Sequence, residues 1–335
     1  MSHPYMLEIR DLHVHFRGYE GVSRVLDGVS LHVGKGERVG LAGETGCGKT
    51  VTMKAVMGIL KIPPAIIPRG EVILDGQNIL KMSAKQLLLM KGTKVSMIFQ
   101  DPMNALNPVF TVGGQLYDVI RFAQPGSGDG EKRVRTEIHD RAMAALEEVR
   151  LPDHDRILKS YPLELSGGMR QRVLIAMALV NGPDFLIADE PQTALDVTIG
   201  AQILDLLNEL VRTKRISVLL ITHNLGVIQE TTERVYVMYA GQVAESAPTA
   251  LLFENPKHPY SQGLLASVPR LTGGEIAEGI RGTVPAYTEA PPGCRFHPRC
   301  DHVMPICSRR KPPLFLVEPD HDVGCWLYGE EGGAK

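Results

Sequence analysis

Hydrophobic and polar residues alternate over two stretches near the start of the chain, residues 7–16 and 25–33. This period of two predicts two β-strands, and the polar, glycine-containing turn between them favours a β-hairpin layer. A short apolar run at residues 38–42 predicts a buried strand, and the proline-free segment at residues 49–60 predicts a helix. The loop between that strand and that helix therefore lies at the carboxyl end of a strand.

The remaining pattern alternates strands with helices. Residues 70–80 predict a hairpin that turns at Asp75-Gly76, a strong turn dipeptide. Ser83 is a typical helix cap, for a helix that ends at Gly92. The further predicted elements are a strand at 95–99, helices at 111–122 and 131–149 separated by a glycine-rich break at 124–130, a helix from Ser166 to Val180, strands at 185–190 and 217–222, and a hairpin at 235–245. This order predicts an α/β fold, with a helical insertion at about residues 101–165 between strands of a parallel sheet.

Length and charge narrow the class of protein. The 335 residues favour a large domain with an appendage, and a hydrophobic share of 44% is ordinary for a globular chain. The 36 basic and 38 acidic residues give a net charge of −2, which argues against nucleic acid or an anionic membrane surface as the main partner. The N-terminus lacks an apolar core of secretory length, and the longest apolar run, residues 173–180, is too short to span a membrane. We expect a cytosolic protein.

A phosphate-binding loop follows the third predicted strand. It fits the pattern G-x-x-x-x-G-K-S/T and consists of Gly43, Glu44, Thr45, Gly46, Cys47, Gly48, Lys49 and Thr50. Its glycines let several backbone N–H groups point at a phosphate, and the helix N-terminus adds a positive dipole end. Lys49 would contact the β and γ phosphates of ATP, and the Thr50 hydroxyl would bind Mg²⁺. The alternative is a glycine-rich turn without a ligand. Cys47 is interpreted as a small filler whose alkylation would block ATP.

Acidic and polar residues follow three further predicted strands. The apolar run at 185–188 ends on Asp189 and Glu190, at the sheet edge where α/β proteins bind ligands. Asp189 would hold Mg²⁺ through water, and Glu190 would polarise the attacking water. His223 follows the strand at 217–222, where it is well placed to sense the γ-phosphate, and Gln100 follows the strand at 95–99. A strand that simply ends in polar residues is the alternative in each case.

Two weaker signals complete the candidate site. Ser166, Gly167 and Gly168 start a predicted helix and form a second anion site or an ordinary helix cap. Phe16 or Tyr19 either stacks on adenine or packs against its neighbours.

These motifs, in this order and spacing, resemble the nucleotide-binding subunit of an ABC transporter. The resemblance covers residues 1–250 and rests on the phosphate loop, Gln100, LSGGM, LIADEP, ALD and the strand-end histidine. It implies a P-loop NTPase of the ABC type, with a RecA-like core, an antiparallel β layer and the helical insertion facing membrane subunits. Two departures are Met169, which replaces the glutamine usual among ABC proteins at large, and Gln192, which stands where a threonine is expected.

The same resemblance implies roles for the site residues. Ser166, Gly167 and Gly168 would complete the ATP site of an opposite subunit, and Asp196 would lie across the dimer interface. His223 would contact the γ-phosphate as a catalytic residue beside Glu190. Gln100 would also be catalytic and would join Thr50 and Asp189 at Mg²⁺.

A narrower resemblance points to the ATPase subunits of dipeptide and oligopeptide importers. It rests on residues 97–108, ELSGGMRQRV, the segment 255–260 followed by Leu264-Leu265, and the segment 293–300. It implies ATP-driven peptide import by a peripheral subunit on the cytoplasmic face of the inner membrane. The implied partners are a second, related ATP-binding subunit in a heterodimer, two integral membrane permease subunits and an extracytoplasmic substrate-binding protein. The alternatives are import of nickel or another small solute, a soluble ABC ATPase that acts on ribosomes or DNA, and a scaffold with degenerate ATP chemistry.

Four cysteines crowd the end of the chain. Cys294, Cys300, Cys307 and Cys325 have the spacing C-x5-C-x6-C-x17-C, wider than typical zinc pairs, and this favours an iron–sulfur cluster. The resemblance implies a 4Fe-4S cluster in a small Cys-rich C-terminal domain at residues 251–335. Zinc and unligated thiols are the alternatives.

Overall fold

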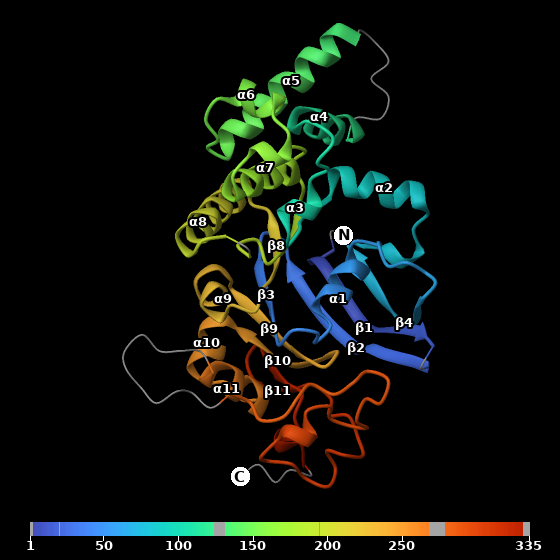
Figure 1. The fold of residues 1–335 in the computed structure, drawn as a ribbon. Coiled ribbons are helices and arrows are strands. Elements are labelled where there is room, and N and C mark those ends of the chain that lie inside the picture. The colour runs from blue at the N-terminus through green and yellow to red at the C-terminus, as the bar shows by residue number, and fades with distance from the viewer. Residues whose placement is uncertain (1–2, 20, 124–130, 194, 268–278, 331–335) are drawn as a thin grey trace. The chain divides into compact units, whose positions relative to one another are not determined.

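The computed structural model describes residues 3–19, 21–123, 131–193, 195–267 and 279–330. They form two compact units (Figure 1). Unit 1 combines residues 1–81 with residues 220–335, and unit 2 is formed by residues 82–219. Within the described ranges, no helix has both the length and the apolar character needed to cross a membrane.

Unit 1 contains the predicted antiparallel β layer. Its strands are β1 (Tyr5–Gly18), β2 (Gly21–Gly34), β4 (Ala65–Leu74) and β5 (Gln77–Asn78), in the order β2-β1-β4-β5. β1 and β2 pair along nearly their whole length, which confirms the hairpin predicted from the alternating pattern. The hairpin turn at Asp75-Gly76 is confirmed as well, with φ values of 44° and 80°.

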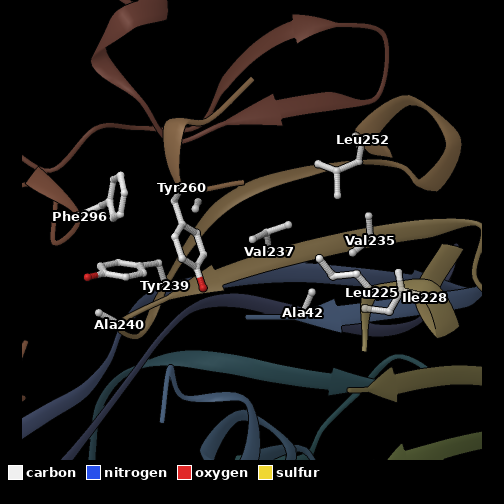
Figure 2. Packing of buried hydrophobic residues seen from close by; sticks show 12 residues of the cluster. Ala42, Leu225, Ile228, Val235, Val237, Tyr239, Ala240, Leu252, Tyr260 and Phe296 are labelled. Atoms are coloured by element: carbon white, nitrogen blue, oxygen red, sulfur yellow. The ribbon is translucent and has the colours of Figure 1, made fainter. Parts of the chain in front are cut away.

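A second sheet of unit 1 supports the phosphate loop. β3 (Arg38–Ala42) runs parallel to β9 (Arg234–Tyr239), which pairs antiparallel with β10 (Gln242–Pro248). Around it lie α1 (Lys49–Val56), α9 (Leu225–Thr231), α10 (Thr249–Glu254) and α11 (Pro259–Ala266). Figure 2 shows the core where side chains of β9 meet those of α9, α10 and α11. The β9–β10 hairpin was predicted; α9, α10 and α11 were not.

The C-terminal segment belongs to this same unit. β12 (His321–Val323) pairs with β10, and β11 (Phe315–Glu318) pairs with β12. Phe296 is 4% exposed in the core cluster of Figure 2. The prediction of a small separate Cys-rich domain is therefore not supported, because apolar side chains and strand pairing join this segment to the sheet. The boundary predicted at residue 250 stays a prediction.

Unit 2 is mainly helical around two parallel strands, β6 (Val95–Ile98) and β7 (Phe185–Asp189). Three helices begin with a side-chain cap, at Ser83, Thr111 and Ser166. The caps at Ser83 and Ser166 were predicted. β8 (Ser217–Ile221) crosses from unit 2 into unit 1. The helices are α2 (Ala84–Thr93), α3 (Pro102–Ala105), α4 (Val112–Phe122), α5 (Glu131–Glu148), α6 (His154–Lys159), α7 (Gly167–Leu179) and α8 (Val197–Lys214). The break predicted at 124–130 lies outside the described residues.

Short 3₁₀ segments complete the described elements. They lie at Ile79–Lys81, Pro162–Glu164, His297–Arg299 and Trp326–Tyr328.

A buried histidine makes the stability of unit 1 depend on pH. His258 is 3% exposed, and its ring accepts a hydrogen bond from the Tyr260 N–H at 3.0 Å. Burial lowers the pKa of His258 from 6.5 to about 4. Between pH 4 and pH 6.5 the unfolded chain binds a proton at His258 that the folded chain does not bind. The contribution of His258 to the free energy of unfolding is therefore fully present above pH 6.5 and is lost as the pH falls towards 4.

We expect His258→Asn to flatten this pH dependence. The asparagine side chain can keep the acceptor role but does not titrate in this range. The wild type should lose roughly 3 kcal/mol more than the variant between pH 7 and pH 4, at about 1.4 kcal/mol per pH unit. Urea unfolding at a series of pH values measures the difference, and parallel profiles for the two proteins would contradict it.

Candidate functional site

The phosphate loop is held in a conformation that only glycine fits at its first position. Gly43 has φ 145°, and a Cβ there would lie 2.2 Å from the Met238 carbonyl oxygen and 2.7 Å from the Cys47 sulfur. The loop joins β3 to α1, as the sequence predicted, and α1 begins at Lys49 with Gly48 as its cap. The backbone therefore leaves β3 in a tight turn and enters the helix within a few residues.

Lys49 lies inside this loop. Its side chain is 7% exposed, and its ammonium donates to the carbonyl oxygens of Gly43 at 2.6 Å and Glu44 at 3.1 Å. Thr50 lies in the first turn of α1 and is exposed. A cation within the loop and a free hydroxyl beside it suit a phosphate group with its Mg²⁺ ion.

The side chain of Cys47, a residue of the phosphate loop, points into the protein core. The residue is fully buried, and its carbonyl accepts a hydrogen bond from the Gly241 N–H at 2.8 Å. Burial raises the pKa of its thiol, against the opposing influence of the Lys49 charge. This environment agrees with the small filler that the sequence suggested; the effect of alkylation stays a prediction.

Gln100 and Glu190 meet in unit 2. β6 and β7 are parallel neighbours, so the residues that follow them lie at the same sheet edge. The Gln100 amide donates to a Glu190 carboxylate oxygen at 2.8 Å. Glu190 has φ 45°, a strained value for a non-glycine residue, and such strain often accompanies function.

Two neighbours complete the acidic group. Asp189 ends β7 and is 7% exposed, which is unusual for an acidic residue. The Thr193 hydroxyl donates to the same Glu190 oxygen as Gln100, at 2.9 Å. Sequence reasoning missed Thr193, although a hydroxyl three residues after an acid is the signal that would have found it.

The Ser166-Gly167-Gly168 segment and Asp196 lie at two neighbouring helix starts in unit 2. The Ser166 hydroxyl accepts from the Met169 N–H at 3.3 Å and so caps α7. A Cβ at Gly168 would lie 2.8 Å from the Ile199 side chain, so this glycine lets α7 approach α8 closely. Asp196 is exposed at the N-cap of α8 and makes no side-chain cap hydrogen bond. Ser166 and Asp196 are exposed, and Gly167 and Gly168 are partly exposed.

The nucleotide contacts predicted for Phe16, Tyr19 and His223 stay predictions. Phe16 is partly buried in β1, opposite Ser23 and Ala65, whereas Tyr19 is fully exposed. His223 follows β8 and is exposed in unit 1.

Sequence reasoning missed three C-terminal side chains that contact the phosphate loop. Tyr260 and Arg299 contact Glu44, and Tyr287 donates a hydrogen bond to the Gly46 carbonyl. Tyr260 and Arg299 lie in segments that carried the narrower resemblance, but no local pattern indicates where their side chains end.

The four C-terminal cysteines do not form the predicted ligand set. Across the described parts of the chain, no group of three or more His, Cys, Asp or Glu side chains is arranged to hold a metal ion. Cys294, Cys300, Cys307 and Cys325 are free thiols. Burial, with neighbouring thiols adding to it, raises the pKa of Cys294 to about 11 and that of Cys325 to about 12. Burial beside other thiols raises the pKa of any metal-free cysteine group, and a bound metal would displace these protons, so the pKa values do not decide whether a cluster binds.

Comparison with known proteins agrees with this geometry. Residues 26–193 match the family model described as "ABC transporter", and residues 244–307 match "Oligopeptide/dipeptide transporter, C-terminal region". The chain is 45% identical to the "Dipeptide transport ATP-binding protein DppD" of Bacillus subtilis, across 96% of this chain and 94% of the relative. It is 44% identical to a "Probable peptide ABC transporter ATP-binding protein" of Sinorhizobium fredii, across 97% of this chain and 96% of the relative.

Solved structures confirm the α/β fold. An ATP-binding cassette solved as a dimer in a post-hydrolysis state, bound to ADP and Pi, matches with a TM-score of 0.63 and 27% identity, across 73% of this chain and 99% of the cassette. The protein cbiO1 of Clostridium perfringens, part of an ABC transporter complex, matches with a TM-score of 0.62 and 25% identity, across 76% of this chain and 92% of cbiO1.

Proposed function

The chain belongs to the ABC transporter ATP-binding proteins of the oligopeptide/dipeptide group, and we propose that it is the ATP-hydrolysing subunit of a peptide importer. The observation that carries the proposal is Lys49, buried inside a phosphate-binding loop with its ammonium on two loop carbonyls. The relatives at 41–45% identity, which are named for peptide, dipeptide or oligopeptide transport, support the substrate class.

Each site residue would have its own role in ATP hydrolysis. Lys49 and the loop N–H groups bind the β and γ phosphates, and Thr50 with Asp189 would hold Mg²⁺. When bound, Mg²⁺ neutralises the charge that develops on the phosphate oxygens. Glu190 takes a proton from the attacking water as general base, and Gln100 orients the Glu190 carboxylate through its hydrogen bond.

We further propose that two ATP-binding subunits act as a pair. Ser166, Gly167, Gly168 and Asp196, of which Ser166 and Asp196 are exposed, would contact the nucleotide of the opposite subunit. This role fits the distance in sequence between the Ser166-Gly167-Gly168 segment and the phosphate loop. The dimeric cassette among the related structures supports this arrangement. We propose a related second chain as partner, so that ATP binding closes the pair and hydrolysis reopens it.

A groove in unit 2 is the proposed docking site for a permease subunit. It has a volume of about 380 Å³ and is lined mainly by apolar side chains of α2, α4 and α7, among them Leu88, Val119 and Phe122. Leu88 and Phe122 remain 53% and 62% exposed, which is unusual for large apolar side chains. A cytoplasmic segment of an integral membrane subunit would cover them and hold this chain at the cytoplasmic face of the membrane. An extracytoplasmic binding protein would deliver the peptide.

Reconstitution tests the proposed function. Co-expressed with permease subunits and a related ATP-binding chain, this protein should copurify with them and drive ATP-dependent uptake of a labelled dipeptide into vesicles. Vesicles without ATP are the control, and labelled nickel ion tests the alternative cargo. Purification without any membrane subunit, or peptide uptake that ATP leaves unchanged, would contradict the proposal.

The iron–sulfur cluster is a separate proposal that rests on the cysteine spacing and the family resemblance. Among the described residues no group of three or more His, Cys, Asp or Glu side chains is arranged to hold a metal ion. Iron analysis and visible absorption after anaerobic purification decide the question, and iron-free protein with intact transport would refute the cluster.

A further inference from the structure

The C-terminal segment of unit 1 contacts the phosphate loop at three points. The Tyr260 hydroxyl accepts a hydrogen bond from the Glu44 N–H at 2.9 Å. The Tyr287 hydroxyl donates to the carbonyl oxygen of Gly46. The Arg299 guanidinium donates to both carboxylate oxygens of Glu44, at 2.8 and 3.2 Å. Residues more than 200 positions apart thus determine the shape of one loop.

The contact between Arg299 and Glu44 is the strongest of the three. It is bidentate, which adds both energy and directional precision to a charge pair. The side chain of Arg299 is 6% exposed and that of Glu44 is 27% exposed, so water screens the pair only in part.

Arg299 is itself fixed by its surroundings. Its guanidinium also donates to the carbonyl oxygens of Arg281 at 2.8 Å and Ile280 at 3.0 Å. The Tyr239 ring lies 5.7 Å away, in cation–π range. Tyr239 packs against Tyr260 and Phe296 in the core of Figure 2. The guanidinium is therefore held in place before any nucleotide arrives.

Glu44 places a negative charge inside a loop built to bind anions. An unpaired carboxylate there would repel the triphosphate of ATP, because like charges in a partly desolvated site repel each other more strongly than in water. The paired guanidinium cancels that charge. Lys49 can then attract the phosphates without an opposing negative charge from the Glu44 carboxylate.

We propose that Arg299 is a positioning residue for ATP: it neutralises Glu44 and so makes the phosphate loop fit for a triphosphate. The inference rests on the proposed function of the loop as an ATP site. It assigns the C-terminal segment a part in nucleotide binding within its own chain. Tyr260 and Tyr287 hold the loop backbone at Glu44 and at Gly46.

Substitutions that remove one or both charges of the Arg299–Glu44 pair test the proposal in the whole chain. We expect Arg299→Gln to weaken binding of the fluorescent nucleotide mant-ATP by about tenfold at low salt, with the difference narrowing as salt increases. Glu44→Gln added to Arg299→Gln should restore affinity to within about twofold of Glu44→Gln alone, because the uncompensated charge is gone. Rescue by a second substitution separates charge from a merely structural role.

Two further variants complete the test. Arg309→Gln removes an exposed arginine of the same segment and should bind mant-ATP like the wild type. Arg299→Lys keeps the charge and should lose much less affinity than Arg299→Gln. Wild-type affinity in Arg299→Gln, failure of the double variant to regain binding, or equal losses in the lysine and glutamine variants would each overturn the inference. A wild-type chain that does not bind mant-ATP would refute the proposed function together with it.

Discussion

Glu190→Gln is expected to lower the rate of ATP hydrolysis by at least ~100-fold while ATP binding is preserved. Glutamine keeps the shape of the side chain but cannot accept the proton of the attacking water. It still accepts hydrogen bonds through its amide oxygen, so Gln100 and Thr193 retain a partner. The loss should therefore appear in the chemical step. Phosphate release per subunit, measured with the reconstituted complex, gives the rate.

The same variant should accumulate in the ATP-bound, closed pair of subunits. Closure needs ATP, and reopening needs its hydrolysis, so a blocked base leaves the pair closed. Size-exclusion chromatography with MgATP should show a larger species for Glu190→Gln than for the wild type. Glu147→Gln is the matched control, because Glu147 is an exposed glutamate of unit 2. An unchanged steady-state rate in Glu190→Gln would exclude Glu190 as the base.

Local patterns predicted the parts of the site that depend on neighbours in sequence. The phosphate loop was identified because its glycines, its lysine and the helix start all fall within eight residues. Gln100 and Glu190 were each predicted to follow a strand, but their contact was not predicted and arises because the two strands are parallel neighbours. Helix caps at Ser83 and Ser166 were predicted for the same local reason.

Contacts between distant segments were not predictable in this way. The bond from Tyr260 to Glu44 joins residues 216 positions apart, and no period or motif indicates it. The family resemblance and the four cysteines suggested a separate C-terminal domain, whereas pairing of β12 with β10 depends on tertiary packing. The wide cysteine spacing favoured a cluster, but spacing carries no information on how the thiols are oriented or buried, and the cluster stays a proposal.

Lys49→Ala is expected to weaken ATP binding by at least ~100-fold, since each hydrogen bond from a charged donor to phosphate contributes about 1.5–3 kcal/mol and Lys49 would supply more than one. In the absence of nucleotide the same ammonium satisfies the carbonyls of Gly43 and Glu44. Its removal should therefore also lower stability by about 1–3 kcal/mol, because those acceptors lose their donor. Mant-ATP fluorescence measures the affinity, and urea unfolding measures the stability.

Lys54→Ala separates the local role of Lys49 from a general effect of charge. Lys54 lies on the exposed side of the same helix, α1, and its removal changes the net charge of the protein equally. It should bind ATP like the wild type, because a solvated charge is screened by water and salt. Equal losses of affinity in Lys49→Ala and Lys54→Ala would mean that overall charge, and not a donor within the loop, attracts the nucleotide. A selective loss in Lys49→Ala would mean that the Lys49 ammonium inside the loop binds the nucleotide directly.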